Sequence, residues 1–186
     1  MKTLARERCK GEILRRLRTV RPESARRWGQ MSAHQMVCHL SDACRMAIGQ
    51  KRVSDATGRL QRTLVKWIAL YLPLRWRTGI LTRPEIDQQC SGTTPVDFAA
   101  DLAELETLVE LITTREKRFD WPAHPIFGRM SRAAWLRWAY LHMDHHLRQF
   151  GARSCSPHAA DQRRNTFEYR TDASSGNQFG KDVTNC

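Results

Sequence analysis

The chain lacks a long uninterrupted apolar run. Its longest apolar stretch, residues 64–74 (LVKWIALYLPL), contains Lys66 and Pro73 and is shorter than the ~20 residues that a helix needs to cross a bilayer. The N-terminal residues are positively charged, but no apolar segment follows them as it would in a secretory signal. These absences argue against a membrane-spanning or secreted protein, and we expect a cytoplasmic one.

The chain also lacks any CxxC pair, although it has six cysteines. This absence argues against a zinc ribbon and against a thioredoxin-like motif. In a cytoplasmic protein the thiols are expected to be reduced. Cys38 and Cys44 share a predicted helix but lie on different faces of it, so we expect no bridge between them.

Acidic residues are scarce relative to basic ones. The chain has 31 Lys and Arg against 19 Asp and Glu, a formal net charge of +12. Nucleic-acid-binding proteins usually gather their basic residues on one face. In residues 1–30, ten basic residues alternate with apolar positions, which is typical of the solvated side of an amphipathic helix. We therefore expect neither nucleic-acid binding nor contact with a membrane.

No strand-like alternation of apolar and polar residues competes with the helical period, so the sequence predicts an all-α protein. Four main helices and an N-terminal one are most naturally arranged as an antiparallel four-helix bundle. The irregular linker after the third helix, residues 77–93, is long enough to cover one end of the fold or its site. Residues 1–152 form the predicted bundle domain, and the polar residues 153–186 a disordered tail. The predicted helices span residues 3–20, 32–49, 58–72, 96–117 and 131–151.

Three of these helices have recognisable start signals. Ser32 with Gln35 predicts a capping box, and Ser131 is a good N-cap. Before the fourth helix, Thr94 is the predicted N-cap, with Pro95 in the first helical position and Asp97 completing a capping box.

The apolar pattern of the predicted helices shows no exposed apolar stripe that would require pairing of two chains.

The last predicted helix places two histidines at the centre of its apolar face. At about 100° per residue, Trp135, His142 and His146 fall in one stripe. Arg137 and Asp144 fall nearly opposite, on the side that is expected to face solvent. No carboxylate shares the stripe, so the imidazole nitrogens need other partners. Side chains at i and i+4 are close enough to bind one metal ion. Hydrogen-bonded core histidines remain the alternative.

The other histidines are less informative. His39 lies at the margin of the apolar side of the second predicted helix, and His34 points away from that side. Bundles build metal sites from inward-facing side chains on neighbouring helices, and His39 can join His142 and His146 in this way. Asp42 would orient His39 or, as the simpler interpretation, be a solvated helix residue. His124 precedes Pro125 and is therefore held extended. It could reach a pocket, but an ordinary loop residue is the simpler interpretation.

Two segments resemble the DinB/YfiT-like superfamily, and within it a bacterial subgroup of unknown function. They are MSAHQMVCHLSDA, around His39, and HPIFGRMSRAAWLRWAYLHMDHHLRQFG, around His142 and His146. The resemblance spans roughly residues 1–152. It implies a four-helix bundle with a three-histidine site for a divalent metal, and the matching positions here are His39, His142 and His146. His145 would then be a neighbour on the flank of the site.

The resemblance implies a metal-dependent enzyme. Three imidazoles leave a coordination position open, and they suit Zn or Ni, with Fe or Co as further candidates. Similar proteins include transferases and isomerases that depend on low-molecular-weight thiols, and presumed hydrolases, so the expected partner is a small molecule. The residues name no catalytic acid or base, and Arg148 and Gln149 are expected only to close the helix end. The alternatives are a non-catalytic metal-binding bundle, either stabilised by the ion or acting as a sensor, and a basic nucleic-acid-interacting protein. The sequence leaves open whether the chain forms a homodimer.

Overall fold

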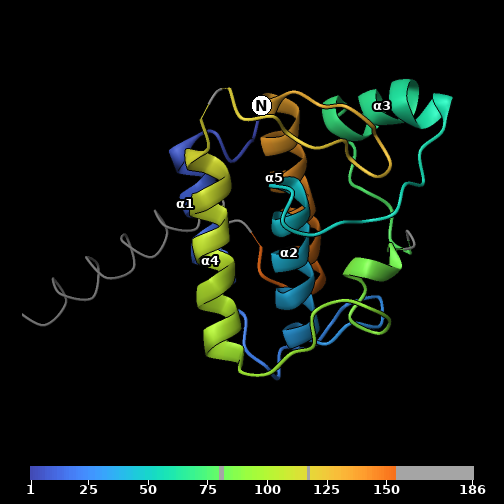
Figure 1. Cartoon of the computed structure of the whole chain (residues 1–186). Helices are drawn as coiled ribbons and strands as arrows, with labels where there is room; N and C mark the ends of the chain where they lie inside the picture. Colours follow the sequence, from blue (N-terminus) through green and yellow to red (C-terminus); the bar gives the residue numbers. More distant parts are fainter. Residues whose placement is uncertain (80–81, 117, 154–186) are drawn as a thin grey trace, which may run out of the picture. The chain divides into compact units, whose positions relative to one another are not determined.

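The computed structural model describes residues 1–79, 82–116 and 118–153, and these residues form an all-α protein, as predicted (Figure 1). Within these ranges the only strand-like pairing is an isolated bridge between His124 and Gly128. No helix in them is both long and apolar enough to cross a membrane. The predicted tail lies outside the described residues, apart from Arg153. The helical elements are α1 (Glu7–Leu17), α2 (Ala33–Ala47), the π-helix η1 (Gln61–Val65), α3 (Lys66–Tyr71), the 3-10 helix η2 (Pro84–Ile86), α4 (Phe98–Thr114) and α5 (Arg132–Gln149).

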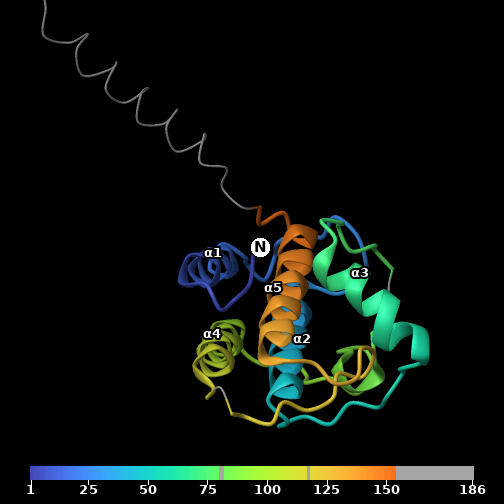
Figure 2. The same ribbon diagram turned by 90° about the horizontal axis from the view of Figure 1, so that it is seen from above.

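The two central helices are α2 and α5, which lie side by side (Figures 1 and 2). α2 packs against α4 and α5, and α5 also packs against α1 and α3. The side chains that fill the space between them are almost inaccessible to water, which is the main source of stability for such a fold. The largest of them include Leu40, Leu105, Ile112, Trp135, Leu136 and Met143.

The helix ends follow local chemistry. Ser32 and Gln35 form the predicted capping box, and the Ser131 hydroxyl accepts a hydrogen bond from the Ala134 amide. The prediction for α4 was wrong in detail. Asp97 is itself the N-cap, because its carboxylate accepts from the Ala100 amide, and Pro95 precedes the helix. A carboxylate at this position also favours the positive end of the helix dipole.

Two arginines expected on solvated helix faces are buried. Arg16 of α1 is almost inaccessible and binds the Asp144 carboxylate and the Ala152 carbonyl. Arg137 of α5 donates to the backbone carbonyls of Leu70 and Lys2. These contacts give most of the buried guanidinium nitrogens an acceptor, and they join the N-terminal residues and α3 to α5.

The third helical region was predicted over residues 58–72, and residues 59–71 are helical, with η1 in their middle. Only Leu70 of α3 is fully buried. Five large side chains along this region are 47–60 % exposed, and we call them the apolar stripe: Leu60, Leu64, Trp67, Tyr71 and Leu74. The sequence pattern was expected to expose no apolar stripe that would require pairing of two chains. The structure does expose a stripe, because only one narrow face of α3 contacts α5, and this exposure does not test pairing.

Candidate metal centre

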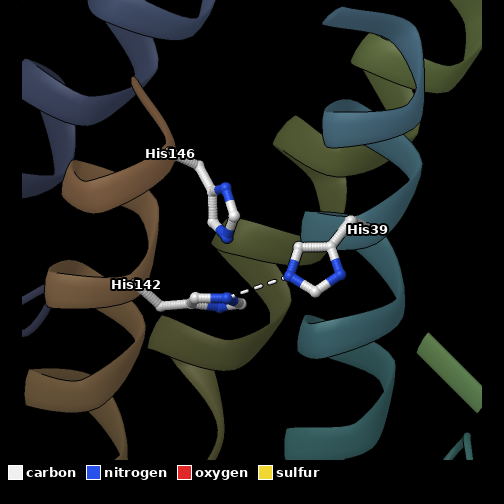
Figure 3. Close-up of side chains that lie close together, drawn as sticks. All are labelled: His39, His142 and His146. Carbon is white, nitrogen blue, oxygen red and sulfur yellow. Dashed lines mark hydrogen bonds between the residues drawn. The ribbon is translucent and has the colours of Figure 1, made fainter. Parts of the chain in front are cut away.

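Three histidines from two helices converge between α2 and α5 (Figure 3). His39 comes from α2, and His142 and His146 from successive turns of α5. One ring nitrogen of each lies within 4.8 Å of the others, and the ring centroids are 4.8–4.9 Å apart. The structure thus brings together the three residues that the sequence singled out.

These imidazoles are held neutral by their surroundings. His39 and His146 are only 2 % and 7 % exposed, and His142 is the most accessible of the three. Burial lowers the pKa of His39. Burial also lowers the pKa of His142 and of His146 well below the usual value, and for these two residues the neighbouring histidines lower it further. A neutral imidazole keeps a lone pair on one ring nitrogen, and the neutral ring is therefore the form that binds metals.

Hydrogen bonds fix which nitrogen of two of these rings carries the proton. His39 Nδ1 lies 2.7 Å from the Ile86 carbonyl oxygen, which accepts only, so Nδ1 is the protonated atom. His146 Nδ1 likewise donates to Gln149 Oε1 at 2.8 Å. Both rings are left with an unprotonated Nε2. His142 Nε2 lies 3.0 Å from His39 Nε2 and donates to it in this arrangement (Figure 3).

The cluster fits a divalent ion. Zinc–nitrogen bonds of about 2.0–2.1 Å with tetrahedral angles place ligand nitrogens about 3.3 Å apart. The separation of 3.0 Å between His39 and His142 needs to widen by a few tenths of an ångström, and the proton of His142 must move to Nδ1. The orienting bonds to Ile86 and Gln149 are of the kind that metal-binding histidines usually make through their second nitrogen.

Sequence reasoning missed the two residues that orient the rings. Gln149 does more than close α5, because its amide nitrogen donates to the Trp28 carbonyl at 2.8 Å and so fixes its oxygen toward His146. Its spacing of three residues from His146, one helical turn, was a signal that could have been used. Ile86 acts through its backbone, which leaves no trace in residue type. The linker of residues 77–93, which contains Ile86, was nonetheless expected to cover one end of the fold or its site. Within this linker, η2 contacts α2.

Replacement of Gln149 by leucine is expected to weaken metal binding by about 10–100-fold, because His146 loses the acceptor that holds its orientation. Isothermal titration with Zn²⁺ would measure the change. Gln149→Glu keeps an acceptor for Nδ1 and should retain most of the affinity. Equal affinity of the Leu variant and the unmodified protein would show that Gln149 has no orienting role.

Asp42 was expected to be solvated or to orient His39, and both expectations were wrong. It is fully buried, and its oxygens accept hydrogen bonds from Thr93 and form ion pairs with Arg45 and Lys51. Burial alone would raise the pKa of Asp42, but the bonds from Lys51 and Thr93 lower it below the usual range. Asp144 is also less solvated than expected, since it pairs with Arg16 and Arg148.

Aromatic rings enclose the histidine cluster. Trp138 stacks on His142 with ring centroids 4.8 Å apart, and the Trp76 ring centroid lies 6.1 Å from that of His142. His145 is partly buried beside His146 and packs against Trp28, and burial lowers its pKa to about 4. His145 is a flanking residue, as expected, and these rings limit the access of water to the cluster.

His124 is not an ordinary loop residue. It is buried, and its Nδ1 accepts from the Ile126 and Phe127 amides. Its ring packs against Trp138, and burial lowers its pKa to about 3. His124 contacts Trp138 and is not part of the three-histidine cluster.

Comparison with known proteins gives one family. The profile of a family described as "Protein of unknown function (DUF1569)" matches residues 8–153, which include all three histidines. No curated protein and no solved structure matches the chain.

Proposed function

The chain belongs to the DUF1569 family of proteins of unknown function, and we propose that it is a metal-dependent enzyme of the DinB/YfiT-like type. The observation that carries the proposal is the convergence of three neutral histidines from α2 and α5. The packing of α2 on α4 and α5, and of α5 on α1, supports the antiparallel four-helix bundle that goes with this assignment.

His39, His142 and His146 would hold the ion, and Zn²⁺ or Ni²⁺ suits their nitrogen atoms better than Mg²⁺ or Ca²⁺. A divalent ion bound there would supply Lewis acidity and lower the pKa of a water or thiol that reaches it. Ile86 and Gln149 keep two of the rings in the required orientation. Trp76 and Trp138 exclude bulk water beside His142, which strengthens electrostatic effects in the site.

A thiol fits the site better than water does. Among the described residues, the ligand cluster contains three histidines and no carboxylate that would serve as a general base. A free thiol has a pKa of about 8.5, so a modest lowering ionises it at neutral pH without such a base. In the reaction we propose, the thiol proton passes to solvent and sulfur forms a bond to an electrophilic carbon. With a chlorinated electrophile the carbon–chlorine bond breaks and chloride departs with the electron pair. With an epoxide the carbon–oxygen bond breaks, and the oxygen stays on the product and takes a proton from solvent.

A turnover assay tests the proposal. The full chain, loaded with Zn²⁺ or Ni²⁺, would be mixed with glutathione or cysteine and a chlorinated or epoxide electrophile, and the loss of free thiol followed with time. We expect a metal-dependent rate in the unmodified protein and the uncatalysed rate in His142→Ala. Tight metal binding without turnover of either thiol would instead identify a non-catalytic metal-binding protein.

A further inference from the structure

A second group of potential ligands lies on a neighbouring face of α2. His34 and Cys38 are one turn apart on this helix, and Asp101 of α4 faces them. His34 was expected to point away from the core, but its Nε2 lies 2.6 Å from Asp101 Oδ2. Cys38 Sγ lies 3.6 Å from the same oxygen. One nitrogen, one sulfur and one oxygen therefore come within 4.8 Å of one another.

The setting of this group differs from that of the three histidines. Cys38 is buried, whereas His34 and Asp101 are partly exposed, so the group opens toward solvent. The Val96 amide also donates to Asp101 Oδ2, at 3.2 Å, and fixes that carboxylate. Phe98 packs edge-on against the His34 ring and limits its rotation. The three side chains are thus held in place before any ion binds.

We propose that His34, Cys38 and Asp101 form a second divalent-cation site that prefers Zn²⁺. Thiolate, imidazole and carboxylate are its usual ligands, and water from the open side would complete four-coordination. Binding requires the thiol to lose its proton to solvent and the His34–Asp101 hydrogen bond to give way to two metal bonds. The proposal does not depend on the three-histidine centre.

Cobalt(II) distinguishes the two sites because a cobalt–thiolate bond gives an intense near-ultraviolet charge-transfer band and a cobalt–imidazole bond does not. We expect the full chain to show this band, with one Co²⁺ ion bound at this site besides the ion that the three-histidine centre takes up. Cys38→Ser should lose the band and one ion. Asp101→Asn should weaken the binding that produces it by at least about tenfold.

Matched variants keep the test specific. Cys44→Ser, on the same helix, and Cys90→Ser, on the surface, should keep the band, since neither thiol has a partner ligand. His142→Ala should keep the band while losing the other ion. Absence of the band in the unmodified protein, or its persistence in Cys38→Ser, would overturn the proposal.

The apolar stripe supports a second, independent inference. It is flanked by five basic side chains from residues 59–77: Arg59, Arg62, Lys66, Arg75 and Arg77. Residues 56–83 contain no acidic residue at all. Within the described part of the chain, none of the five basic side chains forms an ion pair with a carboxylate.

Apolar and basic side chains together favour an anionic surface as the binding partner of the apolar stripe. Leucine and aromatic side chains on one face, with Arg and Lys around them, are typical of helices that lie in the interface of a negatively charged bilayer. A second copy of the chain, pairing through the same stripe, would bring like charges together. We infer that η1 and α3 bind the surface of an anionic lipid bilayer without crossing it, contrary to the expectation from the sequence.

Flotation with lipid vesicles tests this inference. The full chain should bind phosphatidylcholine vesicles that contain phosphatidylglycerol, and bind pure phosphatidylcholine weakly. Replacing Arg59, Arg62 and Lys66 by glutamine should weaken binding about a hundredfold, at about 1 kcal/mol for each charge. Leu64→Ser should also weaken it, since the buried apolar area falls.

A charge-matched control replaces the exposed Arg6, Arg8 and Arg26 by glutamine and should leave most of the binding intact. An equal loss in this control would show that net charge alone attracts the vesicles, which would overturn the inference. A dimer that Leu64→Ser dissociates, without binding to anionic vesicles, would show that the stripe pairs with a second copy.

Discussion

Replacement of His146 by alanine is expected to abolish the stabilisation of the protein by Zn²⁺. An ion that binds the folded chain at 100 times its dissociation constant adds about 2.7 kcal/mol to the free energy of unfolding. The variant leaves two imidazoles in the cluster and should gain almost none of this. Thermal unfolding with and without Zn²⁺ measures the difference. The experiment is best made in a Cys38→Ser background, so that only the three-histidine centre responds.

His145→Ala is the matched control for this prediction. His145 lies next to His146 and is partly buried, yet it is outside the cluster that would hold the ion. The control should keep the full Zn²⁺-dependent stabilisation. If the unmodified protein itself shows no stabilisation by Zn²⁺, Ni²⁺ or Co²⁺, the three histidines are hydrogen-bonded core residues and the metal centre is rejected.

Replacement of Asp42 by alanine should cost about 3 kcal/mol of stability, because it leaves the partly buried Lys51 without its counter-charge and Arg45 with Glu104 alone. Asp42 is fully buried, and Thr93 and Gln88 also donate to it. Its loss would release the residues after η2 from α2. Urea unfolding measures the effect. A cost below 1 kcal/mol would show that water replaces the carboxylate at little penalty.

The same carboxylate gives stability a defined dependence on pH. Its pKa is lower in the folded protein than in the unfolded chain, where it is about 3.9, so the unfolded chain binds more protons in acid. The contribution of Asp42 is therefore complete above about pH 5 and is lost as pH falls through the folded pKa. The difference in stability between the unmodified protein and Asp42→Asn should be constant at neutral pH and shrink below about pH 4. A difference that is independent of pH would mean that the ionised form is not stabilised.

The sequence was most informative about α5, although the same kind of local signal placed the N-cap of α4 three residues too early. The cap at Ser131 and the spacing of His142 and His146 are properties of α5 alone, and both are as predicted. The sequence placed His39 only at the margin of the apolar side of its helix. His39 is buried in the structure because α5 and η2 pack against α2.

Long-range partners explain the errors. Asp42 and His34 appeared polar and solvated on a helical wheel, but Lys51 and Thr93 bind one of them and Asp101 binds the other. These partners lie outside α2, and periodicity within one helix holds no information about them. Arg137 is a similar case, because its partners are backbone carbonyls in α3 and at the N-terminus.

The aromatic enclosure of the histidines has a practical consequence. Three of the six tryptophans, Trp28, Trp76 and Trp138, have rings within about 6 Å of His142 or His145. Indole emission is quenched by a nearby paramagnetic ion and shifts when water leaves its surroundings. The intrinsic fluorescence of the unlabelled chain should therefore report the arrival of Ni²⁺ or Co²⁺, and Trp138→Phe would remove the part of the signal that comes from the ring stacked on His142.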